Sequence, residues 1–528
     1  MNHFSKTFFL TRFYLRKDWV TLVSWLALML LMTVGVAAIY PSVYPNLNNR
    51  IAIINTLKLP SMRAILGPLQ NSTTSISNIF VSELSLWMML LAGIFAIILA
   101  NGNTRKQEDN GLLEIMQARC VGRFAPLLAT FNELILINGL TTILIGSGLN
   151  ILNLTGSNGA GNWLFASLIG VAGLLFGSLT ILLAQVSNNS SQNLTFTFGF
   201  FTLFYLLFVG KMVHPKWPVA WLTPFSVVRK LSIYQHNNFG PILLLFVLGL
   251  ALFGIGFYLA SIRDEGSGLL PSIAGRKALP FLRNYPMLVL VNQFESSAVW
   301  IVLLFIFGAM YSSVLGSIQS IVKGNPLITK ILQTQANQAI TSFLFVISLV
   351  FAVIATVPGI LTIYKLWTDE KRGLIELIYA RPVTRTTVYL ANVLIGMAIS
   401  VVAFVGFEMG IFLTQQATLK SPLKLSHFIS LIWANGLPML VLLTLATAII
   451  VWLPKFGKAI WGVLYVVILL NYFGSLFKIK HWIIESTMFG LIKRNFSHPL
   501  ATEQICLMVG VELILLIASW EHYRKIDL

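Results

Sequence analysis

Acidic residues inside apolar stretches are the first feature of this sequence that could do chemistry. Four acids, Glu83, Glu133, Glu408 and Glu512, lie within or at the edges of long apolar runs, where a carboxylate is costly and commonly functional. Such acids could attract a cation or relay a proton, or they could be hydrogen-bonded packing contacts. None has an equivalent acid at the spacing of the internal repeat described below, so the sequence leaves both interpretations open.

Aromatic residues crowd two of the apolar runs. Phe201 and Tyr205 lie in the run 192–211, and Tyr465 lies in the run 458–475. Aromatic pockets suit apolar compounds, although lipid contact and packing explain aromatic residues equally well. The predicted lining of a substrate path consists of Glu133, Phe201, Tyr205, Glu408, Tyr465 and Glu512. The scattered histidines and two cysteines indicate no metal site, and no catalytic residue is predicted.

A repeated charged segment is the second feature. The chain reads EDNGLLEIMQARCVGR from Glu108 to Arg123 and EKRGLIELIYARPVTR from Glu370 to Arg385. The segments align without a gap at an offset of 262 residues, as from Glu108 to Glu370, and eight of the sixteen positions are identical. Chance would give about one or two identities. The identical pairs are Glu108/Glu370, Gly111/Gly373, Leu112/Leu374, Glu114/Glu376, Ala118/Ala380, Arg119/Arg381, Val121/Val383 and Arg123/Arg385.

Each copy has the pattern of a short helix lying along the membrane surface. Its charges exclude a position across the bilayer. Leu112, Leu113 and Met116 share one predicted helical face in the first copy, and the matching residues share one in the second copy. Gly111 and Gly373 permit a sharp bend. Pro382 should end the second helix at or before the preceding residue. The alternative is a pair of ordinary amphipathic loops made alike by gene duplication.

The elements that position these residues are membrane-spanning helices. Of the 528 residues 56% are hydrophobic and only 10% are charged, whereas soluble domains carry about 25% charged residues. Runs of about 20 apolar residues match the length of a helix across the bilayer. We predict an all-α integral membrane protein with about twelve spans, at residues 19–40, 80–100, 124–147, 163–186, 192–211, 239–262, 298–318, 341–364, 388–414, 427–453, 458–475 and 503–521.

Twelve spans divide into two parallel halves of six. The first half covers residues 1–263 with its charged helix at about 104–119, and the second covers 298–528 with its charged helix at about 366–381. A polar segment, 264–297, is predicted to link them on the cytoplasmic side. Before the first span, residues 2–18 form either an interfacial amphipathic helix or a basic flank.

The distribution of Lys and Arg places both termini in the cytoplasm of a multi-pass plasma-membrane protein. The formal net charge is +18. Because the basic residues lie between apolar runs, they indicate contact with membrane lipid, and we expect no nucleic-acid partner.

The charged repeat resembles the permeases of type-2 ABC exporters, closest to the double-length bacterial permeases of the antibiotic, polyketide and multidrug group. In that family a segment similar to E-x-x-G-L-L-E-L-L-x-A-x-P-V-x-R forms a coupling helix that docks on an ATP-binding subunit. The resemblance implies coupling roles here for Glu108, Gly111, Leu112, Glu114, Arg119, Arg123, Glu370, Gly373, Leu374, Glu376, Arg381, Pro382 and Arg385. The first copy has Cys120 in place of the proline, which puts equal docking of the two halves in doubt.

The resemblance also implies the partners. The sequence contains no G-x-x-x-x-G-K-[ST] loop, so ATP and Mg²⁺ would bind to two separate ATPase subunits, identical or related, and this chain would hold no cofactor and not itself be an enzyme. The expected function is outward movement of an apolar or amphipathic antibiotic or drug-like compound. The alternatives are an ion-coupled secondary transporter that uses the buried acids, and a membrane enzyme acting on lipid or glycan near Glu485, His481 and His498.

Overall fold

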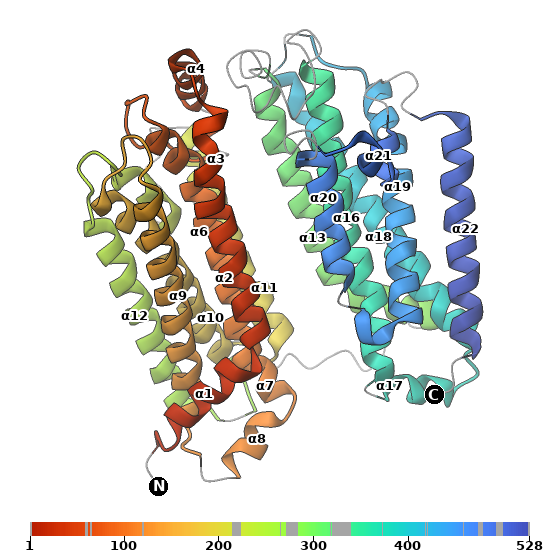
Figure 1. Ribbon diagram of the computed structural model, residues 1–528. Helices are drawn as coiled ribbons and strands as arrows, with labels where there is room; N and C mark the ends of the chain where they lie inside the picture. Colours follow the sequence, from red (N-terminus) through yellow and green to blue (C-terminus); the bar gives the residue numbers. More distant parts are fainter. Residues whose placement is uncertain are drawn as a thin grey trace. The chain divides into compact units, whose positions relative to one another are not determined.

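The computed structural model describes an all-helical chain with no strand in its described part (Figure 1). The chain forms two compact units, Met1–Gly275 and Arg276–Leu528, and their boundary falls in the segment predicted to be a linker. The described residues are 3–58, 62–63, 66–118, 121–213, 223–264, 266–270, 284–316, 318, 339–371, 373–417, 419, 421–457, 459–473, 479–492 and 500–525.

The first unit contains six of the eleven long apolar helices found among the described residues. Its first span runs from Trp19 to Val43 and passes through a π-helical turn at Leu31–Gly35. The spans are α2–η1–α3 (Trp19–Val43), α6 (Ile76–Asn103), α9 (Ala125–Leu152), α10 (Gly159–Val186), α11 (Ser190–Val213) and α12 (Gly240–Ile262). The shorter elements are α1 (Thr7–Lys17), α4 (Leu47–Leu57), α7 (Arg105–Asp109), α8 (Leu112–Gln117) and η3 (Pro224–Lys230).

The second unit contains the other five long helices. They are α13 (Tyr285–Leu315), α16 (Ala339–Lys371), α18 (Arg385–Thr414), α19 (Leu425–Trp452) and α22 (Thr502–Lys525). The shorter elements are α17 (Leu374–Tyr379), η5 (Gln415–Ala417), η6 (Pro454–Phe456), α20 (Ala459–Phe473), α21 (His481–Glu485) and η7 (Met488–Leu491).

Within the predicted span 458–475, the structure describes helix α20 over Ala459–Phe473, and residues 458, 474 and 475 lie outside the described residues. Asn471 and Thr487 exchange hydrogen bonds of 2.9 and 3.0 Å. The chain after α20 therefore folds back against the end of this helix.

Both units share three pairs of contacting helices. The second span (α6, α16) packs on the fourth (α10, α19), the fourth packs on the sixth (α12, α22), and the first (α2, α13) contacts the third (α9, α18). Close approach depends on small residues, since a Cβ atom added to Gly173 of α10 would overlap with Asn138 of α9. The repeat seen in the sequence thus extends to the packing of whole helices.

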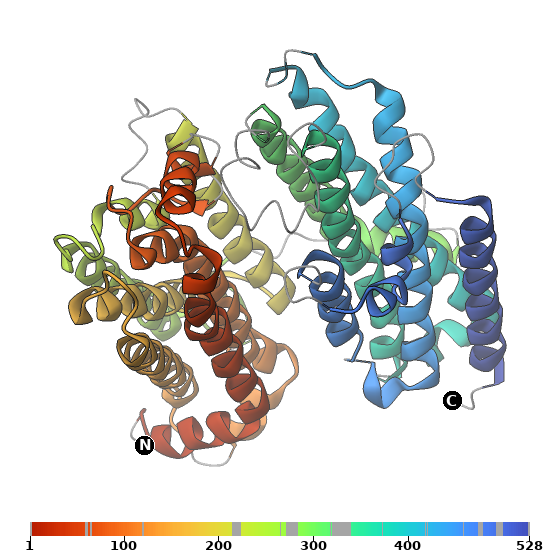
Figure 2. The same cartoon turned by 45° about the horizontal axis from the view of Figure 1, so that its top comes forward.

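Helix α1 turns away from the axis of α2 and packs on α9 (Figures 1 and 2). Leu10, Thr11 and Tyr14 are buried, whereas Phe8, Phe9 and Phe13 are exposed. A separate helix with an exposed aromatic face agrees with the predicted interfacial amphipathic helix better than with a simple basic flank of the first span.

Candidate functional site: the charged segments between the second and third spans

Each charged segment consists of two helices joined at a glycine, where the sequence predicted one helix. Gly111 and Gly373 have nearly the same backbone angles, φ 70° with ψ 5° and φ 70° with ψ 8°. This left-handed conformation costs other residues free energy, and it ends the helix that descends from the second span. The amide of Gly111 donates to the carbonyl of Glu108, and that of Gly373 to the carbonyl of Glu370, both at 2.9 Å.

Helices α8 and α17 present two leucine or isoleucine side chains outward in each unit. Leu112 and Ile115 are 47% and 61% exposed, and Leu374 and Leu377 are 45% and 72% exposed. We call these residues the outer pairs. They occupy equivalent positions in the repeat, and the exposed acids Glu114 and Glu376 lie between the members of each pair. Both segments thus offer the same mixed apolar and acidic surface.

The inner face of each helix holds it to its own unit. Met116 packs on the cluster formed by Leu10, Tyr14, Ala125 and Ala129, whereas Ile375 is buried in the core of the second unit and Ile378 packs against it. Leu112, which was predicted to share one helical face with Leu113 and Met116, is more exposed than these two residues. The left-handed turn at the glycine starts each helix with its first leucine outward.

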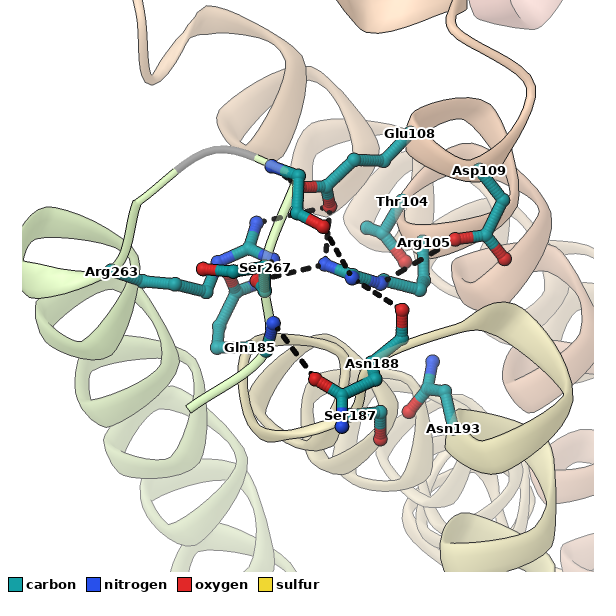
Figure 3. Close-up of polar contacts among 12 residues, drawn as sticks. Thr104, Arg105, Glu108, Asp109, Gln185, Ser187, Asn188, Asn193, Arg263 and Ser267 are labelled. Atoms are coloured by element: carbon teal, nitrogen blue, oxygen red, sulfur yellow. Dashed lines mark hydrogen bonds and ion pairs between the residues drawn. The ribbon is translucent and has the colours of Figure 1, made fainter. Parts of the chain in front are cut away.

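In the first unit, Glu108 faces inward and joins a buried ionic cluster centred on Arg105 (Figure 3). Arg105 is only 1% exposed and its Nη1 atom donates to Glu108 Oε2 at 2.9 Å. The Nε atom of Arg105 lies 3.6 Å from Asp109 Oδ1. Arg263, at the end of α12, also donates to Glu108 Oε2, at 3.0 Å. We refer to Arg105, Glu108, Asp109 and Arg263 as the Arg105 cluster.

The Arg105 cluster also binds two backbone segments that lie far away in the sequence (Figure 3). Arg105 Nη2 donates to the carbonyl of Asn188, in the loop after α10, at 2.6 Å. Ser267, after α12, accepts from Arg105 at 3.2 Å and from Arg263 at 2.7 Å. The cluster therefore ties the start of the charged segment to both neighbouring loops of the same unit.

The last arginine of each charged segment makes a matching contact. Arg123 donates to the carbonyl of Arg263 at 2.6 Å, and Arg385 donates to the carbonyl of Arg524 at 3.3 Å. Both carbonyls lie at the end of the sixth span, where cations satisfy free carbonyl groups. These two residues thus attach the charged segment to its own unit.

The remaining predicted residues of the charged segments have simpler positions. Helix α17 ends at Tyr379, and Arg381 and Pro382 follow in a bend, as the proline predicted. Arg119 lies outside the described residues.

The N-terminal segment contacts the charged segment of the first unit next to the start of α9. The amides of Gly122 and Phe124 donate to the carbonyls of Ser5 and His3, both at 3.1 Å. Tyr14 donates to Gln107 Oε1 at 2.9 Å. Burial and, to a smaller extent, the negative charge of Glu133 raise the pKa of the Tyr14 phenol above its usual range, so it remains a hydrogen-bond donor.

The residues predicted to line a substrate path fall into separate places. In the first unit, Phe201 and Tyr205 pack edge-on against Phe225, with ring centroids 5.5 and 6.1 Å apart. Glu133 is buried and accepts a 2.6 Å hydrogen bond from Asn103. Since Glu133 belongs to this polar network and not to the aromatic group, the structure does not bring these three side chains into one site.

In the second unit, Glu408 is buried and accepts a 2.5 Å hydrogen bond from Ser348. Tyr465 is 45% exposed, and Glu512 is partly exposed on α22. One carboxylate oxygen of Glu133 and one of Glu408 have no hydrogen-bond partner among the described residues.

Sequence reasoning missed Arg105 and Arg263. The usable signal was a basic residue at the end of the second span, three residues before Glu108, and another at the end of the sixth span. Arg105 and Glu108 are only three residues apart, so this pair could have been expected from a helical spacing. Arg263 lies 155 residues from Glu108, and no local pattern could show that these two charges meet.

Eleven long apolar helices among the described residues, and two units that share helix–helix contacts, define a polytopic helical membrane protein of duplicated design. The sequence model for "Multidrug efflux system permease Rv1217c, C-terminal domain" matches residues 11–259 and 282–524, one segment in each half. The chain therefore belongs to this permease family, that of a double-length multidrug exporter permease.

One relative shows the extent of this similarity. The multidrug efflux system permease protein Rv1217c of Mycobacterium tuberculosis is 24% identical over 540 residues, which cover 99% of this chain and 95% of the relative. The similarity thus runs through both halves.

Proposed function

We propose that this chain is the membrane-spanning permease of an ATP-driven exporter that moves apolar or amphipathic, drug-like compounds outward. Its family supports transport, since the relative is named as a multidrug efflux permease. Under this proposal the energy comes from ATP and Mg²⁺ bound to two separate ATPase subunits, the membrane is the plasma membrane, and both termini lie in the cytoplasm.

The repeated surface of α8 and α17 is the observation that carries this proposal. The aliphatic side chains of the outer pairs are not covered by the described residues of their own unit. Exposed apolar side chains on a charged helix outside the spans are typical of a surface that binds a partner. The same outer pair with the same acid occurs twice in one chain. Two similar docking surfaces suit a partner that is present as two similar subunits.

The contacts behind this surface suggest how a movement would be transmitted. A push on α8 would reach α6, α10 and α12 through the Arg105 cluster, because its hydrogen bonds end on residues attached to all three helices. A push on α17 would act through the buried Ile375 and through Arg385 at the end of α22. Closure of the ATPase pair would then shift each half between inward- and outward-facing states.

Association with an ATPase tests the proposal. We would co-express the chain with ABC ATPases from the same source and compare Leu112→Ser/Ile115→Ser and Leu374→Ser/Leu377→Ser with the unchanged chain. Each pair should lower the affinity by about tenfold or more, because the exposed apolar surface is lost. Glu114→Lys and Glu376→Lys should reduce ATP turnover in lipid.

Ile151→Ser is the matched control. Ile151 is 83% exposed but lies at the opposite end of α9 from the charged segment, so this variant should keep full association. A folded chain that captures no ATPase, or outer-pair variants that bind as well as the control, would contradict the proposal.

Ion-coupled transport is the second candidate, favoured by the buried carboxylates Glu133 and Glu408. Each keeps one oxygen without a hydrogen bond among the described residues, as a proton-binding site could. Substrate movement in vesicles driven by a proton gradient, without any ATPase and lost in Glu408→Gln, would establish this function in place of the first.

A further inference from the structure

The two units have a cavity at the same place in the repeat, beside the charged segment. The first is lined by Thr104, Arg105, Glu108, Leu127 and Gln185 among others. The second is lined, among others, by the five residues that lie 262 positions later: Leu366, Trp367, Glu370, Tyr389 and Thr447. The two cavities therefore share these five wall positions, at which the side chains can be compared directly.

In the first unit the cavity is nearly full. Its volume is about 60 Å³, because Arg105 and Arg263 extend into the region between the helix ends. Their guanidinium groups lie against Glu108 at 2.9 and 3.0 Å. The occupant of this place is thus a cation supplied by the chain itself.

In the second unit the cavity is open. Its volume is about 330 Å³, within the range of small-molecule sites. Trp367 stands where the first unit has Arg105, while Glu370 retains the acid of Glu108. Lys525, one repeat after Arg263, pairs with Glu521 at 2.6 Å instead. The second cavity therefore keeps the acid, as Glu370, but has neither of the two guanidinium groups that lie in the first cavity.

The aromatic wall of the open cavity is held in place. The rings of Tyr389 and Tyr523 lie 5.6 Å apart, and both side chains are buried. Their hydroxyl groups contact the carbonyl of Leu516 and the hydroxyl of Tyr379, each at 3.3 Å. Because the polar ends are engaged, the wall presents ring surfaces and not hydroxyl groups to a ligand.

The charges around the cavity are mixed. Glu370 and Glu376 line it together with Lys371, and Lys371 lies over the Trp367 ring at 5.4 Å. Arg385 acts on Glu370 from the side of α18. Lys371 shows that the Trp367 ring accepts a cation on its face, and this exposed side chain can leave when a ligand arrives.

We propose that this cavity binds a hydrophobic organic cation, with an aromatic part against Trp367 and the positive charge towards Glu370. The ligand takes the place that Arg105 fills in the first unit. One part of this inference rests on the proposed function, namely that such cations are a class of transported substrate. They would bind at the side of the membrane where the charged segments lie.

The test uses tetraphenylphosphonium and tetraphenylborate, which share their shape and differ in the sign of their charge. Binding to the full chain in lipid nanodiscs, without an ATPase, would be measured by equilibrium dialysis against empty nanodiscs. We expect saturable binding of the cation and none of the anion. Glu370→Gln should weaken the cation by about tenfold, and Trp367→Arg, which rebuilds the first unit's occupant, should abolish its binding.

Glu503→Gln is the control, because it removes a carboxylate from the other end of α22. It should bind tetraphenylphosphonium as the unchanged chain does. Trp367→Phe provides a second test in case the Trp367→Arg variant does not fold. It should bind tetraphenylphosphonium several-fold more weakly than the unchanged chain and still prefer the cation to the anion. Equal binding of both ions, or full affinity in Glu370→Gln, would overturn the inference.

These outcomes are independent of the ATPase. If the cation binds as expected and no ATPase associates, the cavity assignment stands and the exporter proposal fails. If ATP drives export and Glu370→Gln binds the cation unchanged, the exporter proposal stands and the cavity assignment fails.

Discussion

Single residues decide the geometry of the charged segments. Gly111 and Gly373 are both at φ 70°, and added Cβ atoms would find no neighbour closer than 4.0 Å. Their conservation between the halves therefore reflects the backbone angle and not close packing.

Substitution of one of these glycines should reveal this cost. Gly373→Ala should lower the free energy of unfolding by about 1–2 kcal/mol, and Gly373→Asn should lower it less, because asparagine tolerates the left-handed region. Equilibrium unfolding in mixed detergent–lipid micelles measures both. Gly436→Ala is the control, since Gly436 lies within α19 with open space around it and should lose no stability. Equal losses at both glycines would disprove the backbone explanation.

The Arg105 cluster should be sensitive to the loss of any one charge. Glu108→Gln leaves Arg105 and Arg263 buried with less compensation, so we expect a loss of about 3–5 kcal/mol. The exposed pair Lys525–Glu521 gives the comparison, because Glu521→Gln should cost less than about 1 kcal/mol. The same unfolding measurement applies, and a small effect of Glu108→Gln would mean that the cluster contributes little to the first unit.

At the scale of elements, α1 combines two attachments. Its inner face binds α9 and Gln107, and its outer face exposes Phe8, Phe9 and Phe13 beside the basic residues Arg12 and Arg16. An aromatic and basic helix of this kind belongs at the level of the lipid headgroups.

Spin labels can place α1 relative to the bilayer. With Cys120→Ser and Cys506→Ser as background, a label at Phe8→Cys should be accessible to oxygen at shallow depth, because this side chain is 83% exposed on the apolar face. A label at Arg12→Cys should be more accessible to a water-soluble relaxation agent. The same accessibility at both positions would show that α1 does not lie in the interface.

At the scale of the whole molecule, the order of the spans sets the topology. Tyr379 on α17 contacts Tyr523 near the end of α22, so these two points lie on one side of the membrane. Among the described residues between them lie three long helices, α18, α19 and α22. Since an even number of crossings is needed, the chain that contains α20 has to supply the fourth.

Cysteine labelling tests this arrangement of the chain. In the cysteine-free background, Ile115→Cys and Leu377→Cys should react with a membrane-impermeant maleimide from the same side, because an even number of spans separates them. Ile151→Cys, at the other end of α9, should react only from the opposite side. Labelling of Ile115→Cys and Leu377→Cys from different sides would exclude parallel halves.

Local sequence properties predicted the class of protein and most of its helices. The length of an apolar run follows from the thickness of the bilayer, and this requirement needs no knowledge of the partners of a helix. The repeat could be found for the same reason, since identity at a fixed spacing is visible along the chain.

The tertiary structure alone decided what each repeated residue does. Glu108 and Glu370 are identical in sequence, but one is enclosed by Arg105 and Arg263 while the other lines an open cavity beside Trp367. Leu112, the first residue of α8, is exposed, and Ile375, the second residue of α17, is buried. The left-handed turn at the glycine before each helix sets these directions. Burial and ion pairing depend on residues brought together from distant parts of the chain, and such meetings leave no pattern in the local sequence.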